Sequence, residues 1–246
     1  MANIRTTSRW PRFGRGLAWL VPVLLAVLPL SGTADAGSLK GKVSGGEKVV
    51  PQVYADAAKV DAHRYTWREP SPTVKKEIRD LGANLSRDVC IVALASIAAP
   101  KHDDITVNVT GGRAYWSTLV VSPGTKLVFL SRDPFPHRLY LNGNDSFKPD
   151  EMAGGGRREW TAPSQGTFTF LDKNFPTLKL VVAVEAGAVD FTFPNHTGAY
   201  AFPNLPSGDY VIRAYFEGKP VGKPAAVGLK ASAEVKDTIN LGDPSQ

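Results

Sequence analysis

Short runs of β-branched and aromatic residues follow one another along most of the chain beyond residue 37. Clusters of Gly, Pro, Asn and Asp separate these runs, and this alternation is typical of short strands joined by turns. The predicted strands are Leu39–Val43, Val89–Ala95, Ile105–Val109, Trp116–Val121, Lys126–Leu130, Arg138–Leu141, Thr167–Leu171, Lys179–Val184, Asp190–Phe193, Tyr210–Tyr215 and Glu234–Leu241. Their spacing predicts an all-β protein made of sandwiches.

One stretch shows helical rather than strand periodicity. Apolar residues between Ser71 and Gly82 are spaced at i, i+4 and i+7, with the serine able to cap the first turn and the glycine able to end the last. This predicts one short helix near 71–82. The surrounding segment, 54–87, is polar and has little strand character, so we interpret it as an insertion between two strands.

The first 36 residues have the three parts of a secretory signal peptide. Four arginines precede an apolar run, Leu17–Leu30, and small residues follow it up to Ala36. The run is shorter than the roughly 20 residues that a membrane-spanning helix needs. We predict that 1–36 is a signal peptide cleaved after Ala36, which leaves no stable membrane span and a periplasmic or secreted protein. Retention of the segment as an anchor is the alternative.

Composition and charge narrow the class of protein further. The chain is 43% hydrophobic and 21% charged, which is the composition of a globular protein rather than a disordered one. Its net charge of +6 includes the arginines of the predicted signal peptide. The remaining basic residues are scattered along the chain in pairs rather than stripes, so we do not expect nucleic-acid binding.

The chain has one cysteine, Cys90, which lies within an apolar predicted strand. A single cysteine excludes an internal disulfide and any cysteine-rich zinc module. We interpret Cys90 as a buried, inert thiol.

The two ends of the mature chain resemble one known module. Gly41-Lys42-Val43, together with the stretch from Gly198 to Ile212 that contains Pro206-Ser207-Gly208, resembles the carboxypeptidase regulatory-like (transthyretin-like or prealbumin-like) β-sandwich. Independently of any family, this stretch has two runs with alternating apolar positions joined by a Pro-x-Gly turn. The resemblance implies a discontinuous sandwich over 37–103 plus 187–246.

The middle of the chain, 104–186, resembles a second family. The stretch from Val121 through Pro123-Gly124 and Phe129 to Asp133, followed by His137, is similar to the plastocyanin-like (cupredoxin) signature. The resemblance implies that this histidine is the first metal ligand in copper-binding members. The other ligands follow as Cys-x-x-His-Pro-x-Met, and together they form a type 1 copper site.

The second half of that signature is present here without its ligands. When Gly166 and Pro176 are placed on the conserved glycine and proline of the family pattern, Asp172 falls on the cysteine, Phe175 on the histidine and Leu178 on the methionine. Of the four ligands only the histidine of the first motif remains. The expected fold is therefore a cupredoxin-like Greek-key sandwich inserted in or adjoining the regulatory-like sandwich, with no cofactor and no type 1 copper.

The remaining site candidates surround the lost ligand positions. His137 and Asp172, joined by Asp133, are candidate metal ligands, and the alternative is a histidine that is simply hydrogen-bonded to a carboxylate. Phe135, His137 and Asp172 form the candidate binding surface. Among the aromatic residues of this region, Phe135 is the one that we expect to be exposed, whereas core positions are expected for Trp116 and Tyr140.

Other candidates have simpler interpretations. His102 and His196 lie near the predicted joints of the two modules, where an interface role is conceivable. The stretch from Gly154 to Arg158 has glycines and arginines that suit an anion, but it does not open a helix, so we interpret it as a hairpin. No nucleophile–base motif is present, and the protein is not expected to be an enzyme.

These observations favour a non-enzymatic exported binding or accessory protein on a copper-less cupredoxin-like scaffold, with an unidentified protein or envelope partner. One alternative is a metal-binding or electron-transfer protein with a non-standard site at His137 and Asp172. The other is a structural cell-envelope or carbohydrate-associated spacer protein.

Overall fold

The computed structural model describes residues 36–49, 85–96, 99, 102–230, 232–235 and 238–243. The predicted signal peptide up to residue 35, the predicted helix at 71–82 and residues 54–84 of the predicted insertion lie outside them. The described part of the chain has two one-turn helices, α1 (Gly46–Val49) and α3 (Leu85–Asp88). None of its helices is long and apolar enough to cross a membrane.

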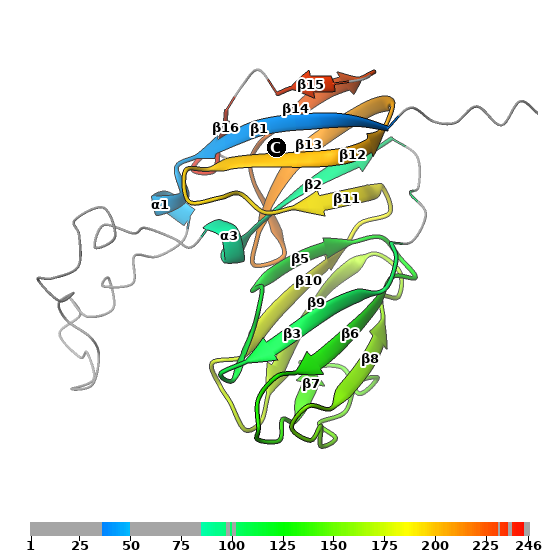
Figure 1. The fold of residues 1–246 in the computed structure, drawn as a ribbon, viewed down its shortest axis with the longest axis vertical. Coiled ribbons are helices and arrows are strands. Elements are labelled where there is room, and N and C mark those ends of the chain that lie inside the picture. The colour runs from blue at the N-terminus through cyan, green and yellow to red at the C-terminus, as the bar shows by residue number, and fades with distance from the viewer. Residues whose placement is uncertain are drawn as a thin grey trace, which may run out of the picture. The chain divides into compact units, whose positions relative to one another are not determined.

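Two sheets formed by the ends of the described chain enclose one hydrophobic core (Figure 1). The first sheet contains β12 (Ala199–Pro206), β1 (Ala36–Ser44), β15 (Ser232–Glu234) and β16 (Ile239–Asn240). The second contains β11 (Ala188–Thr192), β2 (Val89–Ala95), β13 (Gly208–Phe216) and β14 (Lys219–Leu229). Leu39, Phe202 and Ile212 are fully buried between these sheets, because alternate residues of each strand face inward.

The turn between β12 and β13 has the shape that its sequence predicts. Both strands form, and Pro206-Ser207-Gly208 joins them across the two sheets. The hydroxyl of Tyr210 donates a hydrogen bond of 2.6 Å to the carbonyl of Pro206, four residues upstream. This contact resembles the tyrosine corner that holds such crossings in other β-sandwiches.

Two further sheets are formed by the middle of the chain and enclose a second core. One contains β5 (Thr118–Val121), β10 (Lys179–Val184), β9 (Gly166–Asp172) and β7 (Leu139–Leu141). The other contains β4 (Arg113–Ala114), β3 (Ile105–Thr110), β6 (Lys126–Ser131) and β8 (Arg157–Thr161). Phe129 and Phe170 meet at the centre of this core, with ring centroids 4.8 Å apart.

The all-β prediction is therefore confirmed, with local differences at strand ends. The strand predicted from Trp116 begins at Thr118. The strand predicted over Glu234–Leu241 is replaced by the short β15 and β16, which both pair in parallel with β1. The bounds of the two sandwiches as domains remain a prediction.

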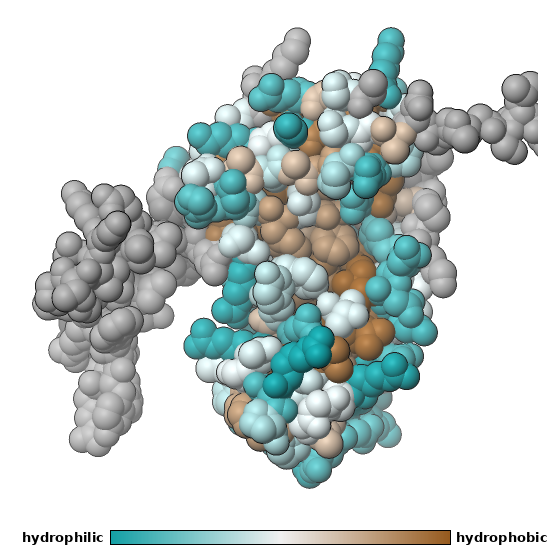
Figure 2. All heavy atoms as spheres, in the orientation of Figure 1, coloured by the Kyte–Doolittle hydropathy of each residue, from teal (hydrophilic) through white to brown (hydrophobic). Residues whose placement is uncertain are grey.

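Apolar and aromatic side chains connect the two pairs of sheets. A small cluster that includes Val92 of β2, Val120 of β5 and Tyr215 of β13 is buried between them. At the edge of this cluster Trp116 and Phe193 stack, with ring centroids 5.1 Å apart. Figure 2 shows apolar side chains gathered over the same region, where β11 and β5 lie in Figure 1. We call this contact region the seam.

Candidate functional site

The predicted ligand positions come together where β6 and β9 end. Asp133 and His137 lie in the loop between β6 and β7, and Asp172 is the last residue of β9. Pairing of β7 with β9 sets Leu139 opposite Asp172, which brings the preceding loop beside it. The backbone of His137 also exchanges two hydrogen bonds of 2.8 Å with that of Met152, so its position is fixed from both sides.

Both ring nitrogens of His137 face carboxylates. Nδ1 lies 2.8 Å from Oδ2 of Asp172, and Nε2 lies 3.0 Å from Oδ2 of Asp133. The histidine is fully buried, and the two aspartates are nearly so, at 4% and 6% exposure. We call these three residues the His137 centre.

Backbone N–H groups satisfy the other lone pairs of Asp172. Its Oδ1 accepts hydrogen bonds from the amides of Asn174 at 2.7 Å, Phe175 at 3.2 Å and Arg138 at 3.3 Å. The chain that follows β9 is therefore folded around this carboxyl group.

Asp133 is anchored by the turn between β3 and β4. Its oxygens accept hydrogen bonds from the amides of Gly111 at 2.6 Å and Gly112 at 3.0 Å. Burial alone would raise the pKa of the Asp133 carboxyl, but the hydrogen bonds from these glycines and from His137 together hold its pKa below the usual value. Asp133 is therefore ionised at neutral pH.

These contacts use both ring nitrogens of the His137 centre. Each nitrogen lies within hydrogen-bond distance of a carboxylate oxygen. The imidazole is therefore held between Asp133 and Asp172, and neither nitrogen faces open space.

Apolar side chains close the centre. The Phe175 ring centroid lies 5.0 Å from that of His137, and the Phe135 ring lies 5.5 Å away. Leu178 is fully buried in the core of the same pair of sheets. Phe175 and Leu178, which the sequence analysis aligned with two ligand positions, therefore pack here as apolar side chains.

The residues present do not fit a copper or zinc ion. A metal bound between an imidazole nitrogen and a carboxylate oxygen holds them about 3.3 Å apart in tetrahedral geometry. Here the two contacts of His137 are direct hydrogen bonds, so both ring nitrogens are already engaged by carboxylates. Among the described residues, no group of three or more His, Cys, Asp or Glu side chains has an arrangement that could hold a metal ion.

The predicted binding surface needs correction, because its three residues differ in accessibility. His137 and Asp172 are buried, since their polar atoms are used within the centre. Phe135 is half-buried rather than exposed, because its ring packs against Phe175 at 4.7 Å. Among the residues that the structure describes, the large apolar side chain that is exposed is Tyr115, at 64%. A partner at this end would contact Phe135 and Phe175, not the imidazole.

The other predicted core aromatics are also only half-buried. Trp116 packs at the seam, and Tyr140 lies under the Nζ atom of Lys173 at 4.3 Å from the ring centroid. Cys90 is fully buried as expected, and its burial raises the pKa of the thiol, which leaves it unreactive.

The glycine-arginine stretch leads into β8 and is not an open anion site. Nη1 of Arg158 donates a 2.7 Å hydrogen bond to the carbonyl of Leu139, and its guanidinium lies 3.9 Å from the centroid of the Phe147 ring. The hairpin interpretation fits these contacts.

His102 makes contacts across the seam, whereas His196 is exposed. Nδ1 of His102 accepts a hydrogen bond from the amide of Ser122, and Nε2 donates to the carbonyl of Val189 in β11 at 3.1 Å. The ring is therefore held in one neutral tautomer. Burial lowers its pKa, although the carbonyl of Val189 and the charges of Asp190 and Asp103 act in the opposite direction.

We expect this histidine to make the protein less stable as the pH falls below about 6.5, the value of the unfolded chain. Because the folded pKa is lowered, the unfolded state binds more protons between the two values, and stability falls as the pH drops through this window. Replacement of His102 by Asn keeps an acceptor for Ser122 but removes the titration. Urea unfolding of both proteins between pH 8 and pH 5 measures the difference in the free energy of unfolding. The same pH dependence in both proteins would contradict the lowered pKa of His102. Burial raises the pKa of Asp190 and the charge of His102 lowers it, so the measured difference includes the change in Asp190 as well.

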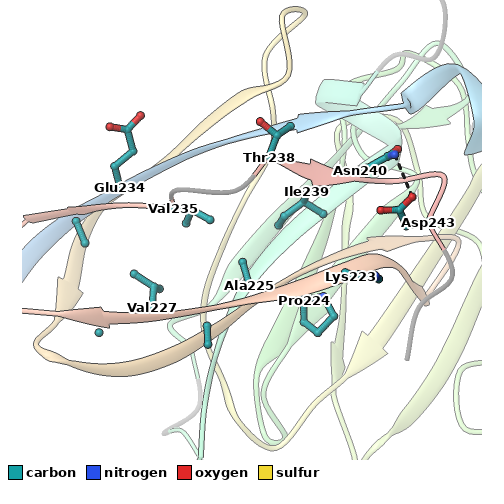
Figure 3. A pocket seen from close by; sticks show the side chains of 13 residues that line it. Lys223, Pro224, Ala225, Val227, Glu234, Val235, Thr238, Ile239, Asn240 and Asp243 are labelled. Atoms are coloured by element: carbon teal, nitrogen blue, oxygen red, sulfur yellow. Dashed lines mark hydrogen bonds between the residues drawn. The ribbon is translucent and has the colours of Figure 1, made fainter.

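A separate groove of about 840 Å³ lies between β14 and the β15–β16 edge (Figure 3). Its lining mixes apolar side chains such as Ala225 and Val227 with polar ones such as Lys223. Nδ2 of Asn240 donates a 3.0 Å hydrogen bond to Asp243 at its rim.

Comparison with known proteins finds similar solved structures but no matching family or curated protein. A scan against protein-family models and a search of curated proteins both find no match. Among solved structures, a copper-containing nitrite reductase from Thermus scotoductus is 20% identical over 38% of this chain, with a TM-score of 0.31, and the match spans 25% of the reductase chain. A purple cupredoxin from Nitrosopumilus maritimus is 21% identical over 33% of this chain and all of its own, with a TM-score of 0.31. An oxidised methionine-to-leucine mutant of amicyanin is 20% identical over 40% of this chain and 99% of its own, also with a TM-score of 0.31.

Proposed function

We propose that the protein is a non-enzymatic exported binding or accessory protein whose cupredoxin-like sandwich works without copper. The observation that carries this proposal is the His137 centre itself. Its one remaining ligand histidine has both nitrogens engaged by Asp133 and Asp172, within 3.0 Å. A site that served a metal would keep one of these nitrogens free.

The same observation disfavours the alternative of a non-standard metal or electron-transfer site. To bind an ion, His137 would have to give up one of its carboxylate contacts, inside a space closed by Phe175 and Leu178. Breaking a buried ion pair costs about 3–5 kcal/mol, which weak coordination by the remaining groups would have to exceed. A spacer protein also lacks a specific observation in its favour.

Titration of the purified protein with Cu(I), Cu(II) and Zn(II), followed by calorimetry, tests the proposal. We expect no stoichiometric submicromolar binding, because both ring nitrogens of His137 are already hydrogen-bonded to carboxylates. Stoichiometric binding that the His137→Ala variant abolishes would contradict the proposal.

A restored variant tests the assignment of the lost positions. Asp172→Cys, Phe175→His and Leu178→Met together place a thiolate, an imidazole and a thioether around His137. We expect this triple variant to take up copper with the intense absorption of a copper–thiolate bond. The matched control is the single Asp172→Cys variant, which should not reproduce that band. Failure of the triple variant to bind copper would show that these positions are not former ligands.

A further inference from the structure

The groove between β14 and the β15–β16 edge is closed at both ends (Figure 3). At one end Gly222 lies against β16, since a Cβ atom there would lie 2.7 Å from the backbone oxygen of Asn240 and 3.1 Å from Cγ2 of Ile239. At the other end only two residues of the chain separate β14 from β15. An added peptide strand would need open ends, whereas a volume of about 840 Å³ lies within the range of small-molecule sites.

The middle of the groove is elongated and aliphatic. Ala225 and Val227 line it from β14, and Val235 and Ile239 line it from the other side. All four belong to the hydrophobic core of this pair of sheets or pack against it. The part of β14 along the groove, 222–229, is roughly 23 Å long. The core therefore reaches the surface along a narrow strip, where an aliphatic chain would leave water by extending it.

The charged groups of the groove lie at its two ends. Lys223 lies at the same end as Asn240 and Asp243, and Glu234 lies at the opposite end, where its side chain extends away from β14 (Figure 3). The carboxylate of Asp243 accepts the 3.0 Å hydrogen bond from Asn240. Lys223 is exposed, and none of the ion pairs among the described residues includes it. The charge that lacks a partner at this end is therefore a cation.

We propose that the groove binds an aliphatic carboxylate, with its chain along the middle and its carboxylate beside Lys223. The chain gains free energy by leaving water, and the carboxylate pairs with the ammonium group. A symmetric contact with a second copy would set two concave surfaces together and fill neither. The site lies in the pair of sheets formed by the ends of the described chain, so it does not depend on the function proposed for the His137 centre.

Calorimetric titration of the purified protein tests the site, with octanoate, decanoate, decanol and decyltrimethylammonium as probes below their micelle or solubility limits. We expect one decanoate per chain, bound about fifteenfold more tightly than octanoate, because each methylene contributes about fourfold. Decyltrimethylammonium has the same chain with a cationic head and should bind more weakly than decanoate. Equal affinities for octanoate and decanoate, or no saturable binding, would overturn the groove as a site. Tighter binding of the cation would overturn the carboxylate.

Variants of the full chain test where the probe binds. Ala225→Phe should abolish decanoate binding, because the ring fills the middle of the groove. Its matched control is Ala201→Phe, at an exposed alanine of β12. Lys223→Met keeps most of the side chain and should weaken decanoate binding about three- to fivefold while leaving decanol binding unchanged. Lys40→Met, at an exposed lysine of β1, is the control for charge and should alter neither.

These variants also separate the possible failures. Decanoate binding that survives Ala225→Phe would overturn the groove, as would self-association of the protein that the same variant abolishes. If Ala225→Phe does not fold, Lys223→Met still decides, because equal decanoate affinities for Lys223→Met and the unaltered protein would overturn the proposed orientation. Copper uptake by the unaltered protein would instead overturn the function proposed for the His137 centre.

Discussion

Replacement of His137 by alanine is expected to lower the free energy of unfolding by about 3–5 kcal/mol. The substitution removes the hydrogen-bond partner shared by Asp133 and Asp172, whose oxygens lie 3.0 Å and 2.8 Å from the ring nitrogens. Two buried aspartates would then face an apolar hole without that partner, and both are held in place by backbone amides. Chemical denaturation at neutral pH, with the midpoint and slope both fitted, measures the loss.

A milder variant at the same centre separates charge from geometry. In Asp172→Asn the amide oxygen can still accept the hydrogen bonds of Asn174 and Phe175, while the amide nitrogen can donate to Nδ1 of His137. Nε2 of the ring keeps its hydrogen bond with Asp133. We expect a loss of about 1 kcal/mol, far smaller than for the alanine variant.

The two variants together keep the interpretation falsifiable if His137→Ala fails to fold. A loss as large for Asp172→Asn as for His137→Ala would mean that the charge of Asp172, and not its hydrogen bonds alone, holds the centre together. A loss below about 1 kcal/mol for His137→Ala would show that the two aspartates do not depend on the imidazole.

The centre could be predicted in part, because local patterns carry its positions. The spacing of Gly166 and Pro176 places Asp172, Phe175 and Leu178 correctly relative to the strand and the loop after it. Pairing of β7 with β9 then brings His137 to Asp172, as the two sequence motifs imply. Both steps follow from strand alternation and turn residues, which are visible in the sequence.

The fine structure of the centre could not be predicted, because it depends on contacts distant in the chain. Nothing in the sequence links Asp133 to the amides of Gly111 and Gly112 more than twenty residues earlier, so its strong anchoring was missed. The exposure of Phe135 was overestimated for the same reason, since its packing partner Phe175 lies in another loop. Two adjacent glycines in a hairpin turn are a usable signal, since such turns direct free N–H groups toward an anion.

The seam also depends on long-range contacts. Gly218 lies at one of them, where substitution is expected to lower stability. β13 and β14 are joined by the two-residue turn Glu217-Gly218, in which both residues have positive φ, 49° and 74°. This is the turn geometry that suits the twist of a hairpin. The amide of Glu217 donates a 2.9 Å hydrogen bond to Oγ1 of Thr118 in β5, so the turn contacts the other pair of sheets.

We expect Gly218→Ala to lower the free energy of unfolding by about 2–4 kcal/mol. A Cβ atom at this position would lie 2.6 Å from Cγ1 of Val181 and 2.7 Å from Cγ2 of Thr167, which are both strand residues of the opposing sheet. The control is Gly143→Ala, because Gly143 has nearly the same φ, 70°, and nothing within 4 Å of its Cβ position. The control should lose only the roughly 1 kcal/mol that a left-handed alanine costs. The difference between the two losses measures the contact of the turn with β9 and β10, and equal losses would mean that the two pairs of sheets do not meet there in solution.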